Sequence, residues 1–453
     1  MSGRTAPEIT QALVDSVREL RYEEIPEDAR EAARHCLLDF LAVALAGVRE
    51  PLVGILVETI VRPEGSTEAR LVGRPERATR LTAALVNGAA GHALDFDDTH
   101  MRMNGHPTVP VLPALLALAD REAVTGRALL TALVVGIELE CRLGVLVGAQ
   151  HYEVGFHSTA TLGTFGAAAA AAHLLGLDAG QWLHAMGLAG SQAAGLKSAF
   201  GTMTKPLHAG RAASAGLLAA LLARGGFTAA TDVLEAKQGF LETHAGDRPE
   251  LSRLDRLRDR FLVRETLFKY HAACYLTHAA IEAGRGLRQR HDIDPAAIDD
   301  VELTVAPALL RVCNIAEPRT GLEGKFSLRA TTAMALLGVD TADLATYSDR
   351  RMADPALIRL RDRVRVVADA DREATRARVT VLAGTRRFEA EADTGIPATD
   401  LSEQRSRLRR KFDALAEPCL GAERAARLAT AALGVDDLPR AAELLELARP
   451  KAD

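Results

Sequence analysis

Apolar residues recur every three to four positions along most of the chain, and this spacing is typical of amphipathic or buried helices. The stretch from Pro26 to Gly47 begins with a proline and acidic residues and ends at a glycine, which are ordinary helix start and stop signals. Four further helical runs precede residue 265: RLTAALVNGAAGHALDF, VLPALLALADREA, GRALLTALVVGIELECRLGVLV and PLHAGRAASAGLLAALLARGG. Several are apolar on nearly every side, so we expect them inside a helical layer.

The pattern changes near residue 266. A helix is expected over AACYLTHAAIEAGRGLRQR, followed by strands at DDVELTVAP and RVRVVADA. The segments ARVTVLAG and TRRFEAEAD alternate polar and apolar residues around an Ala-Gly-Thr turn, which predicts a hairpin. Helical runs return after about residue 400. The sequence therefore predicts a mostly α fold, with a large all-helical domain (residues 1–265 and 400–453) and an inserted smaller α/β lid domain (residues 266–399).

Composition narrows the class of protein. Of 453 residues, 48% are hydrophobic but only 4% aromatic, so alanine and leucine carry a core suited to close-packed helices. The net charge of −5 comes without a basic block, so no nucleic-acid partner is expected. Five scattered cysteines fit neither a zinc ribbon nor a redox CxxC motif and suit a reducing compartment. The chain starts without an apolar signal-like core, and we expect a cytoplasmic protein with no membrane span.

Titratable side chains are concentrated in GHALDFDDTHMRMNGHP, residues 91–107. If the preceding helix continues through this stretch, His92, Asp95 and Thr99 share one helix face. On the same assumption Asp97 and His100 point elsewhere. One wall of a site would then carry a carboxylate beside an imidazole, an arrangement that acid–base catalysis requires. The alternative is a capped helix end with solvated acids.

Histidines are unusually dense in this part of the chain, since eight of the 13 fall between His92 and His208. The helix is expected to break at Asn104 and Gly105, which places His106 in the adjoining loop. His208 is expected to support a helix rather than the chemistry. The density of imidazoles favours a functional interpretation of the Asp-rich stretch over a solvated helix end.

Two helix starts extend the candidate site. His157 precedes Ser158 and Thr159, which are residues that can cap a helix. Lys205 stands beside Pro206, a favoured first helical residue. A lysine near the free N–H groups of a helix start forms a natural cradle for a carboxylate. The alternative for Lys205 is a surface lysine near a loop.

A third stretch, FKYHAACYLTHAAIEA, follows the change of pattern. Cys274 and His278 are four residues apart, which places them on one helix face. Lys269 lies just upstream, and Lys325 in EGKFSLRA is a further candidate anion contact. The alternative for Cys274 is a small buried hydrophobe, the commoner role of an isolated cysteine.

Five blocks together resemble the MmgE/PrpD family, also called the 2-methylcitrate dehydratase family. They are NGAAGHALDFDDTH with HPTVPVLPALLALA, GFHSTATLGTFGAAAAAAHLLGLD, GTMTKPLHAGRAASAGLLAALLA, FKYHAACYLTHAAIEA and GKFSLRATTAMAL. The resemblance implies a large helical domain with a smaller α/β lid domain, assembled as a homodimer. It also implies enzymes that act on small di- or tricarboxylates without a metal or organic cofactor.

The resemblance orders the expected functions. A 2-methylcitrate dehydratase-like lyase comes first, and an iminodisuccinate epimerase-like isomerase or a cis-aconitate decarboxylase-like lyase remains open. The expected catalytic residues are His106, His157, Asp95, His278 and Lys205. The expected substrate contacts are Thr99, Lys205, His92, Cys274, Lys269 and Lys325.

Within that set each residue type has an expected role. Lys205 would hold the developing negative charge, and His106 and His157 would transfer protons. Asp95 would orient a histidine or act as a partner base, and His278 would protonate a leaving hydroxide or a carbon.

Two more remote alternatives remain. The first is a metal-dependent helical enzyme with an Asp-rich site, although Met101 stands where the third acid of a DDxxD motif belongs. The second is a helical scaffold with no catalytic activity. No metal ligand is assigned from the sequence.

Overall fold

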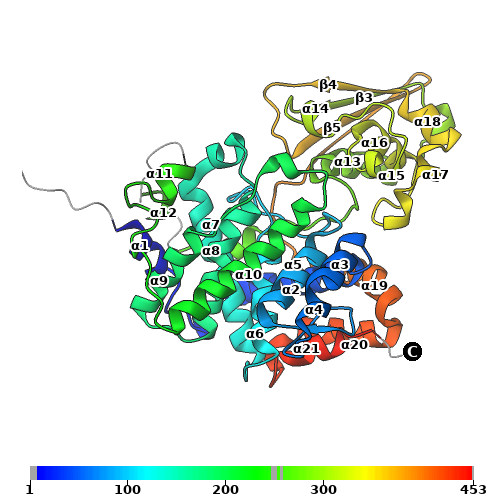
Figure 1. Ribbon diagram of the computed structural model, residues 1–453. Coiled ribbons are helices and arrows are strands. Elements are labelled where there is room, and N and C mark those ends of the chain that lie inside the picture. The colour runs from blue at the N-terminus through cyan, green and yellow to red at the C-terminus, as the bar shows by residue number, and fades with distance from the viewer. Residues whose placement is uncertain (1–7, 246–251, 256–258, 451–453) are drawn as a thin grey trace, which may run out of the picture. The chain divides into compact units, whose positions relative to one another are not determined.

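The computed structural model of the protein describes residues 8–245, 252–255 and 259–450 (Figure 1). The chain divides into two compact units. Unit 1 contains the described residues up to Phe268 and from Ala398 onward, and unit 2 runs from Lys269 to Pro397. Helices predominate in the described residues and the sheets are small, which confirms the predicted mostly α fold with a small α/β part.

Unit 1 is built almost entirely from helices. They are α1 (Ile9–Asp15), α2 (Glu27–Gly47), α3 (Pro51–Leu56), α4 (Arg62–Glu64), α5 (Arg80–His92), α6 (Thr108–Ala119), α7 (Gly126–Val154), α8 (Ser158–Leu174), α9 (Ala179–Gly190), α10 (Thr204–Arg224), α11 (Phe240–His244), α12 (Ser252–Asp255), α19 (Leu401–Leu420), α20 (Ala422–Leu433) and α21 (Ala442–Leu447). Its only sheet among the described residues pairs β1 (Ala69–Arg70) with β2 (Arg77–Ala78).

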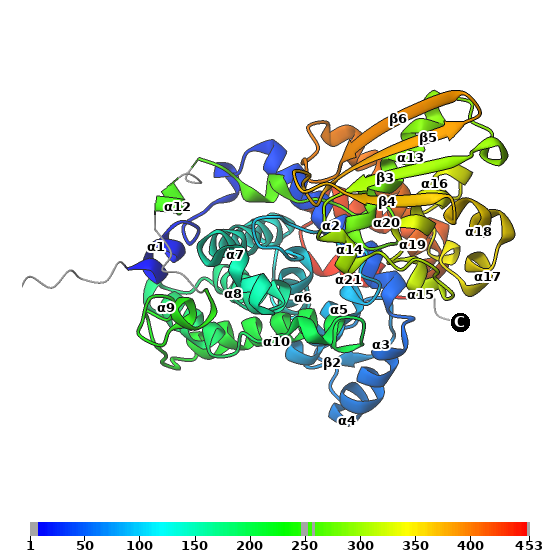
Figure 2. The ribbon, with the colours of Figure 1, turned by 90° about the horizontal axis from the view of Figure 1, so that it is seen from above.

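Helix α8 lies at the centre of unit 1, where it packs against α6, α7, α9 and α10 (Figures 1 and 2). Its alanine run from Ala167 to Ala172 is fully buried, as the apolar pattern predicts. Helices α5 and α10 touch backbone to backbone, since a Cβ added at Gly88 would lie 2.8 Å from the Cα of Gly210. Small residues therefore allow the close helix packing that brings the end of α5 to the start of α10.

The C-terminal helices pack on the N-terminal half of unit 1, because α19 lies against α2. A buried ion pair links these helices: the Nζ atom of Lys411 is 2.6 Å from Oδ1 of Asp39. The same ammonium group donates to the backbone carbonyl of Phe96 at 2.7 Å. Lys411 thus holds the loop between α5 and α6 at the backbone of Phe96. That loop carries most of the candidate site.

Unit 2 combines one sheet with short helices. The elements are α13 (His278–Arg290), β3 (Asp300–Val305), α14 (Leu309–Val312), α15 (Gly321–Gly324), α16 (Leu328–Leu337), α17 (Asp349–Met352), α18 (Pro355–Arg361), β4 (Val364–Ala368), β5 (Arg376–Ala383) and β6 (Arg386–Asp393). The strand order is β4-β3-β5-β6, with β3 parallel to β4 and the other pairs antiparallel. Helix α13 packs on β5 and β6, and α16 packs on β4 and on α13.

The expected hairpin is confirmed as β5 and β6, which are joined at Gly384 with a φ of +59°. This left-handed conformation suits glycine in a tight turn. The helix expected over residues 272–290 begins only at His278, after the 3₁₀ turn Tyr275–Thr277. Cys274 therefore precedes the helix, and the prediction that Cys274 and His278 share a helix face is wrong.

No single helix among the described residues has both the length and the apolar character needed to cross a membrane. The helical segments Glu27–Gly47 and Pro51–Glu64 meet this requirement only when taken together, and the chain bends by 79° between them.

Candidate acid–base site

The site is built on the loop of residues 93–107, between α5 and α6. Helix α5 ends at His92, and Asp95 has a φ of +51°, a left-handed conformation that cannot continue a right-handed helix. The prediction that His92, Asp95 and Thr99 share one helix face is therefore wrong. Asp tolerates this conformation better than most residues do, and the turn reverses the direction in which the next acids point.

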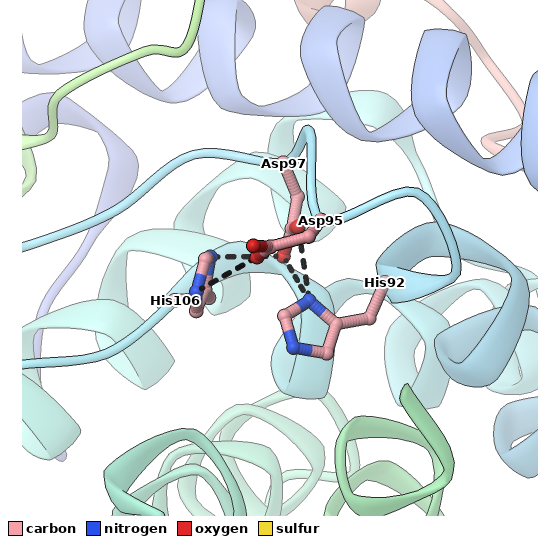
Figure 3. Close-up of side chains that lie close together, drawn as sticks. All are labelled: His92, Asp95, Asp97 and His106. Carbon is pink, nitrogen blue, oxygen red and sulfur yellow. Dashed lines mark hydrogen bonds and ion pairs between the residues drawn. The ribbon is translucent and has the colours of Figure 1, made fainter. Parts of the chain in front are cut away.

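Asp97 is the central carboxylate of the site, although the helical interpretation pointed it elsewhere. Both of its oxygens lie 2.9 Å from Nδ1 of His92, and Oδ2 lies 3.2 Å from Nδ1 of His106 (Figure 3). Burial alone would raise the pKa of Asp97, but His106 and His92 hold it well below its ordinary value. Asp97 is thus an ionised group that orients two imidazoles.

His106 has its tautomer set by the loop. Its Nδ1 lies 2.6 Å from the backbone carbonyl of Asp98, and a carbonyl only accepts, so Nδ1 carries the proton. In the neutral ring the other nitrogen, Nε2, is then bare, and it lies 3.7 Å from Oδ1 of Asp95. The His106 side chain keeps 12% of its surface exposed, so this basic nitrogen can be reached.

The start of α8 holds the backbone of His106. The N–H of His106 donates to Oγ1 of Thr159 at 3.0 Å. A Cβ at Gly105 would lie 3.0 Å from the backbone nitrogen of Thr159, so glycine permits this approach. Thr159 was expected to cap α8, but His157 occupies the N-cap position and makes no side-chain cap bond. The Thr159 hydroxyl serves the loop instead.

Lys205 joins the cluster from the first turn of α10. Its Nζ donates to Oδ1 of Asp95 at 2.7 Å, and it lies 5.3 Å from the ring centre of Phe200. The helix begins at Thr204, one residue before the lysine, rather than at Pro206. Exposed fractions of 15% for Lys205 and 32% for Asp95 leave this ion pair open to an incoming anion.

His157 adds a third imidazole at the start of α8. Its ring stacks near His92 with centroids 5.8 Å apart, and His92 lies 4.6 Å from the His106 ring centre. Burial, followed by the charges of His92, Lys205, His106 and His208, lowers the pKa of His157 well below its ordinary value. Burial likewise lowers the pKa of His92 to about 4. Both rings are therefore neutral at physiological pH.

The remaining residues of the loop are structural in this arrangement. The backbone of Thr99 pairs with Leu267, and its hydroxyl donates to the carbonyl of Gly105 at 3.1 Å. His100 bonds the carbonyl of Leu262 through Nε2 at 2.9 Å. The hydroxyl of Thr108 bonds the buried carboxyl of Asp98. Burial and the nearby Asp39 raise the pKa of Asp98 to about 8.

The candidates in unit 2 form a second group. His278 is the first residue of α13, and its Nε2 lies 3.3 Å from the carbonyl of Ala273. Lys269 and His278 are each 2% exposed, and the half-buried Lys325 lies 5.9 Å from the ring centre of Tyr347. The buried Cys274 forms a hydrogen bond with Cys313 that raises the pKa of the Cys313 thiol.

The last residue of α5 and three residues of the loop also satisfy the distances of a metal site. One ligand atom each from His92, Asp95, Asp97 and His106 lies within 4.8 Å of the others. Two imidazoles and two carboxylates are suitable donors for a transition metal. However, the ammonium group of Lys205 lies 2.7 Å from Asp95 and already supplies a positive charge there.

These observations define a class of protein: a mostly α fold with an acid–base cluster where the end of α5 meets the starts of α8 and α10. Residues 11–252 match the MmgE/PrpD N-terminal domain, and residues 271–437 match the MmgE/PrpD C-terminal domain. The chain belongs to the MmgE/PrpD family, as the sequence blocks suggested.

The proteins similar to this chain are named for two enzyme activities. Cis-aconitate decarboxylase of Aspergillus terreus is 31% identical over 300 residues, which cover 62% of this chain and 61% of that protein. Cis-aconitate decarboxylase of Mus musculus is 31% identical over 294 residues, 63% of this chain and 60% of that protein. The alignments span about three fifths of these decarboxylases.

A 2-methylcitrate dehydratase of Cupriavidus necator is 29% identical over 395 residues, which cover 80% of this chain and 78% of that protein. Decarboxylase and dehydratase are both names of lyases, which supports the expectation of an enzyme of this type.

Proposed function

We propose that the protein is an acid–base lyase that makes or breaks a bond next to a carboxylate of a small di- or tricarboxylate. A 2-methylcitrate dehydratase-like reaction is the first choice. The observation that carries the proposal is the convergence of Lys205, His106 and His157 on one cluster: Lys205 and His106 contact Asp95, and the His157 ring lies 5.8 Å from that of His92. These groups come from three separate segments, and acid–base chemistry on an anion needs that combination.

The anion-holding role falls to Lys205. Removing a proton beside a carboxylate places extra negative charge on the substrate, which a nearby ammonium group and helix-start N–H groups stabilise. Asp95 pairs with this ammonium group at 2.7 Å. A substrate carboxylate would share Lys205 with Asp95 or displace it, and the partial exposure of both side chains permits either.

The proton-transfer role falls first to His106. Its Nδ1–H is held by the Asp98 carbonyl and by Asp97, which leaves Nε2 as the basic atom. A positioned carboxylate also stabilises the imidazolium formed when Nε2 takes a proton. His157 is the other transfer group, and it can also protonate the leaving hydroxide. His278 of unit 2 is proposed as the acid for that hydroxide, or for a carbon, where His157 does not supply the proton. Asp95, whose Oδ1 lies 3.7 Å from Nε2 of His106, is proposed to stabilise the imidazolium once Nε2 carries a proton, or to act as a partner base.

A decarboxylase-like reaction is the second candidate, because the decarboxylase relatives are 31% identical to this chain. The same groups would serve, with an imidazolium returning a proton to the carbon that loses CO₂. An iminodisuccinate epimerase-like reaction is the third candidate, and it needs two imidazoles on opposite sides of one carbon.

One NMR experiment separates the three reactions. The protein is incubated in D₂O with 2-methylcitrate, citrate, cis-aconitate and iminodisuccinate, and each compound is followed with time. We expect loss of water from 2-methylcitrate; itaconate formation indicates decarboxylation, and deuterium entry at carbon without loss of water or CO₂ indicates epimerisation. No change in any of the four compounds would refute the proposal.

We further propose that Lys205, rather than a metal ion, supplies the positive charge of the site. Exhaustive chelation, checked by elemental analysis, should leave turnover unchanged. Loss of activity that zinc, iron or manganese restores would instead assign His92, Asp95, Asp97 and His106 as ligands. A cytoplasmic homodimer is also proposed, and light scattering of the purified protein tests its mass against that of a single chain.

A further inference from the structure

His157 has a partner that the proposed reaction has not used. His208, in the second turn of α10, places its Nδ1 3.1 Å from Nδ1 of His157. The ring centroids are 5.4 Å apart. The edge-on ring of Phe200, with its centroid 5.0 Å from that of His157, restricts the imidazole from another side. The two imidazoles thus face each other nitrogen to nitrogen.

A contact between two like nitrogens requires one proton between them. Either His157 donates through Nδ1–H and its Nε2 is bare, or His208 donates and Nε2 of His157 carries the proton. The first arrangement makes His157 a base and the second makes it an acid. Moving one proton across 3.1 Å therefore changes the chemical role of His157.

The electrostatics of the cluster explain why such a partner is useful. His157 is 2% exposed, and burial together with His92, Lys205, His106 and His208 holds its pKa well below its ordinary value. An imidazolium at this position is costly, so His157 alone would be a weak base. His208 is only half-buried, and the pKa of its ring is lowered by burial and by Lys205. Its greater access to solvent makes it the better place for a positive charge.

We propose that His208 is a proton relay that acts through His157, an inference that rests on the proposed lyase function. The relay operates where His157, rather than His106, is the base: when the substrate C–H bond breaks, its proton goes to Nε2 of His157. The Nδ1 proton of His157 passes to Nδ1 of His208, and His208 releases its Nε2 proton to water. His157 is then neutral and carries a proton on Nε2.

The reverse shift completes the elimination. Nε2–H of His157 protonates the leaving hydroxide, His208 returns its Nδ1 proton to His157, and Nε2 of His208 takes a proton from water. The substrate loses one proton and one hydroxide, and both imidazoles regain their initial tautomers. No step leaves a positive charge on the buried ring beside Lys205.

The kinetic test compares His208→Gln with a matched control, His184→Gln. His184 is another half-buried histidine of unit 1, in α9, and its Nδ1 lies 3.0 Å from the carbonyl of Ala229. We expect kcat of His208→Gln to fall by about tenfold to a hundredfold with KM nearly unchanged. The acid limb of its kcat profile should move to lower pH, because His157 must then carry the charge itself. The control should match the wild type in both respects.

Chemical rescue distinguishes a relay from a packing role. In His208→Ala, added imidazole should restore part of kcat in a saturable way, whereas a purely structural defect would not respond. A kcat within twofold of wild type, with the wild-type pH profile, would overturn the proposal. Loss of activity with no change of profile and no rescue would also overturn it.

A measurement on the wild-type protein needs neither a variant nor a substrate. In ¹⁵N-histidine NMR spectra of the resting protein, the two Nδ1 atoms of the pair should carry one proton between them. Either one signal lies at the protonated and one at the bare position, or both lie between these positions because the proton exchanges rapidly. Two bare Nδ1 signals, or two protonated ones, would refute the relay even if the enzyme is active, because no hydrogen bond would then join the two Nδ1 atoms. Absence of turnover on all four carboxylates would instead refute the lyase function, so the two failures are distinguishable.

Discussion

Histidines gather near a lysine in both units, but their hydrogen bonds differ. In unit 1, His106 uses one nitrogen to bond the loop and presents the other, Nε2, toward Asp95 and the partly exposed Lys205. In unit 2, His271 uses both nitrogens, with Thr341 Oγ1 at 2.8 Å and Glu282 Oε1 at 3.2 Å, and it is fully buried. A histidine with both nitrogens committed holds a fold together, and a proton carrier needs one nitrogen that is bare and reachable.

His278 lies between these cases. Its Nε2 faces the carbonyl of Ala273, so in the neutral ring Nδ1 is bare, as Nε2 is in His106. Burial, with the charges of His271 and Lys269, lowers the pKa of His278 well below its ordinary value. The comparison therefore separates His271, a structural residue, from His278, which is chemically able to act. The variants below test this difference between the two units and are given in order of decreasing expected effect.

The largest effect is expected for Lys205→Ala. Removing the ammonium group withdraws the main positive charge from the developing anion, so kcat/KM should fall by about a thousandfold. Since Asp95 is 32% exposed, its carboxylate can be solvated and the fold should survive. Steady-state kinetics and a thermal melt measure the two effects.

Lys197→Ala is the control for this variant. Lys197 is also a partly buried lysine of unit 1, but its Nζ bonds the carbonyl of Tyr152 at 2.9 Å rather than a carboxylate of the site. Its kcat/KM should stay near wild type. Normal turnover by Lys205→Ala would contradict the proposal that Lys205 holds the developing negative charge.

A smaller effect is expected for His278→Gln. If unit 2 supplies the acid, its proton is the Nε2–H of His278 that faces the Ala273 carbonyl, and losing that proton should lower kcat by about a hundredfold, at the low end for acid–base groups. His291→Gln is the control within the same unit, because the His291 ring lies against Phe388, with centroids 5.0 Å apart, rather than beside Lys269 or His271. A kcat equal to that of the control would restrict the chemistry to unit 1.

The sequence indicated most residues of the candidate site but not the contacts between them. His106, His157 and Lys205 stand beside glycine, proline and helix-start residues, and these local signals mark shaped loops. Asp97 was missed because periodicity extended α5 too far, whereas the left-handed turn at Asp95 redirects the chain. His208 was assigned to helix support because its partner lies 51 residues away, and periodicity carries no information about contacts between segments.

The smallest effect is expected for a buried carboxyl group without a hydrogen-bond partner among the described residues, that of Glu140. Asp97 and Glu140 are both buried acids of unit 1, yet Asp97 contacts two imidazoles, whereas neither oxygen of Glu140 has a hydrogen-bond partner among the described residues. Burial and the nearby Asp98 raise the pKa of Glu140 well above its ordinary value, so its carboxyl stays protonated when folded. Replacing it by an unbranched apolar side chain, in Glu140→Met, should stabilise the protein by about 1–3 kcal/mol.

The pH dependence gives this prediction its sign. Because the pKa of Glu140 is higher in the folded than in the unfolded chain, protonation of this carboxyl favours the folded state. Its contribution to the free energy of unfolding is fully present below about pH 4.5 and is lost as the pH rises. Urea unfolding should therefore show a larger gain for Glu140→Met at pH 8 than at pH 5. Some slope remains in the variant, because burial also raises the pKa of Glu138 to about 7. Glu153→Met, at an exposed position of the same helix, should give no gain; a destabilised Glu140→Met would mean that the carboxyl has a partner that offsets its burial.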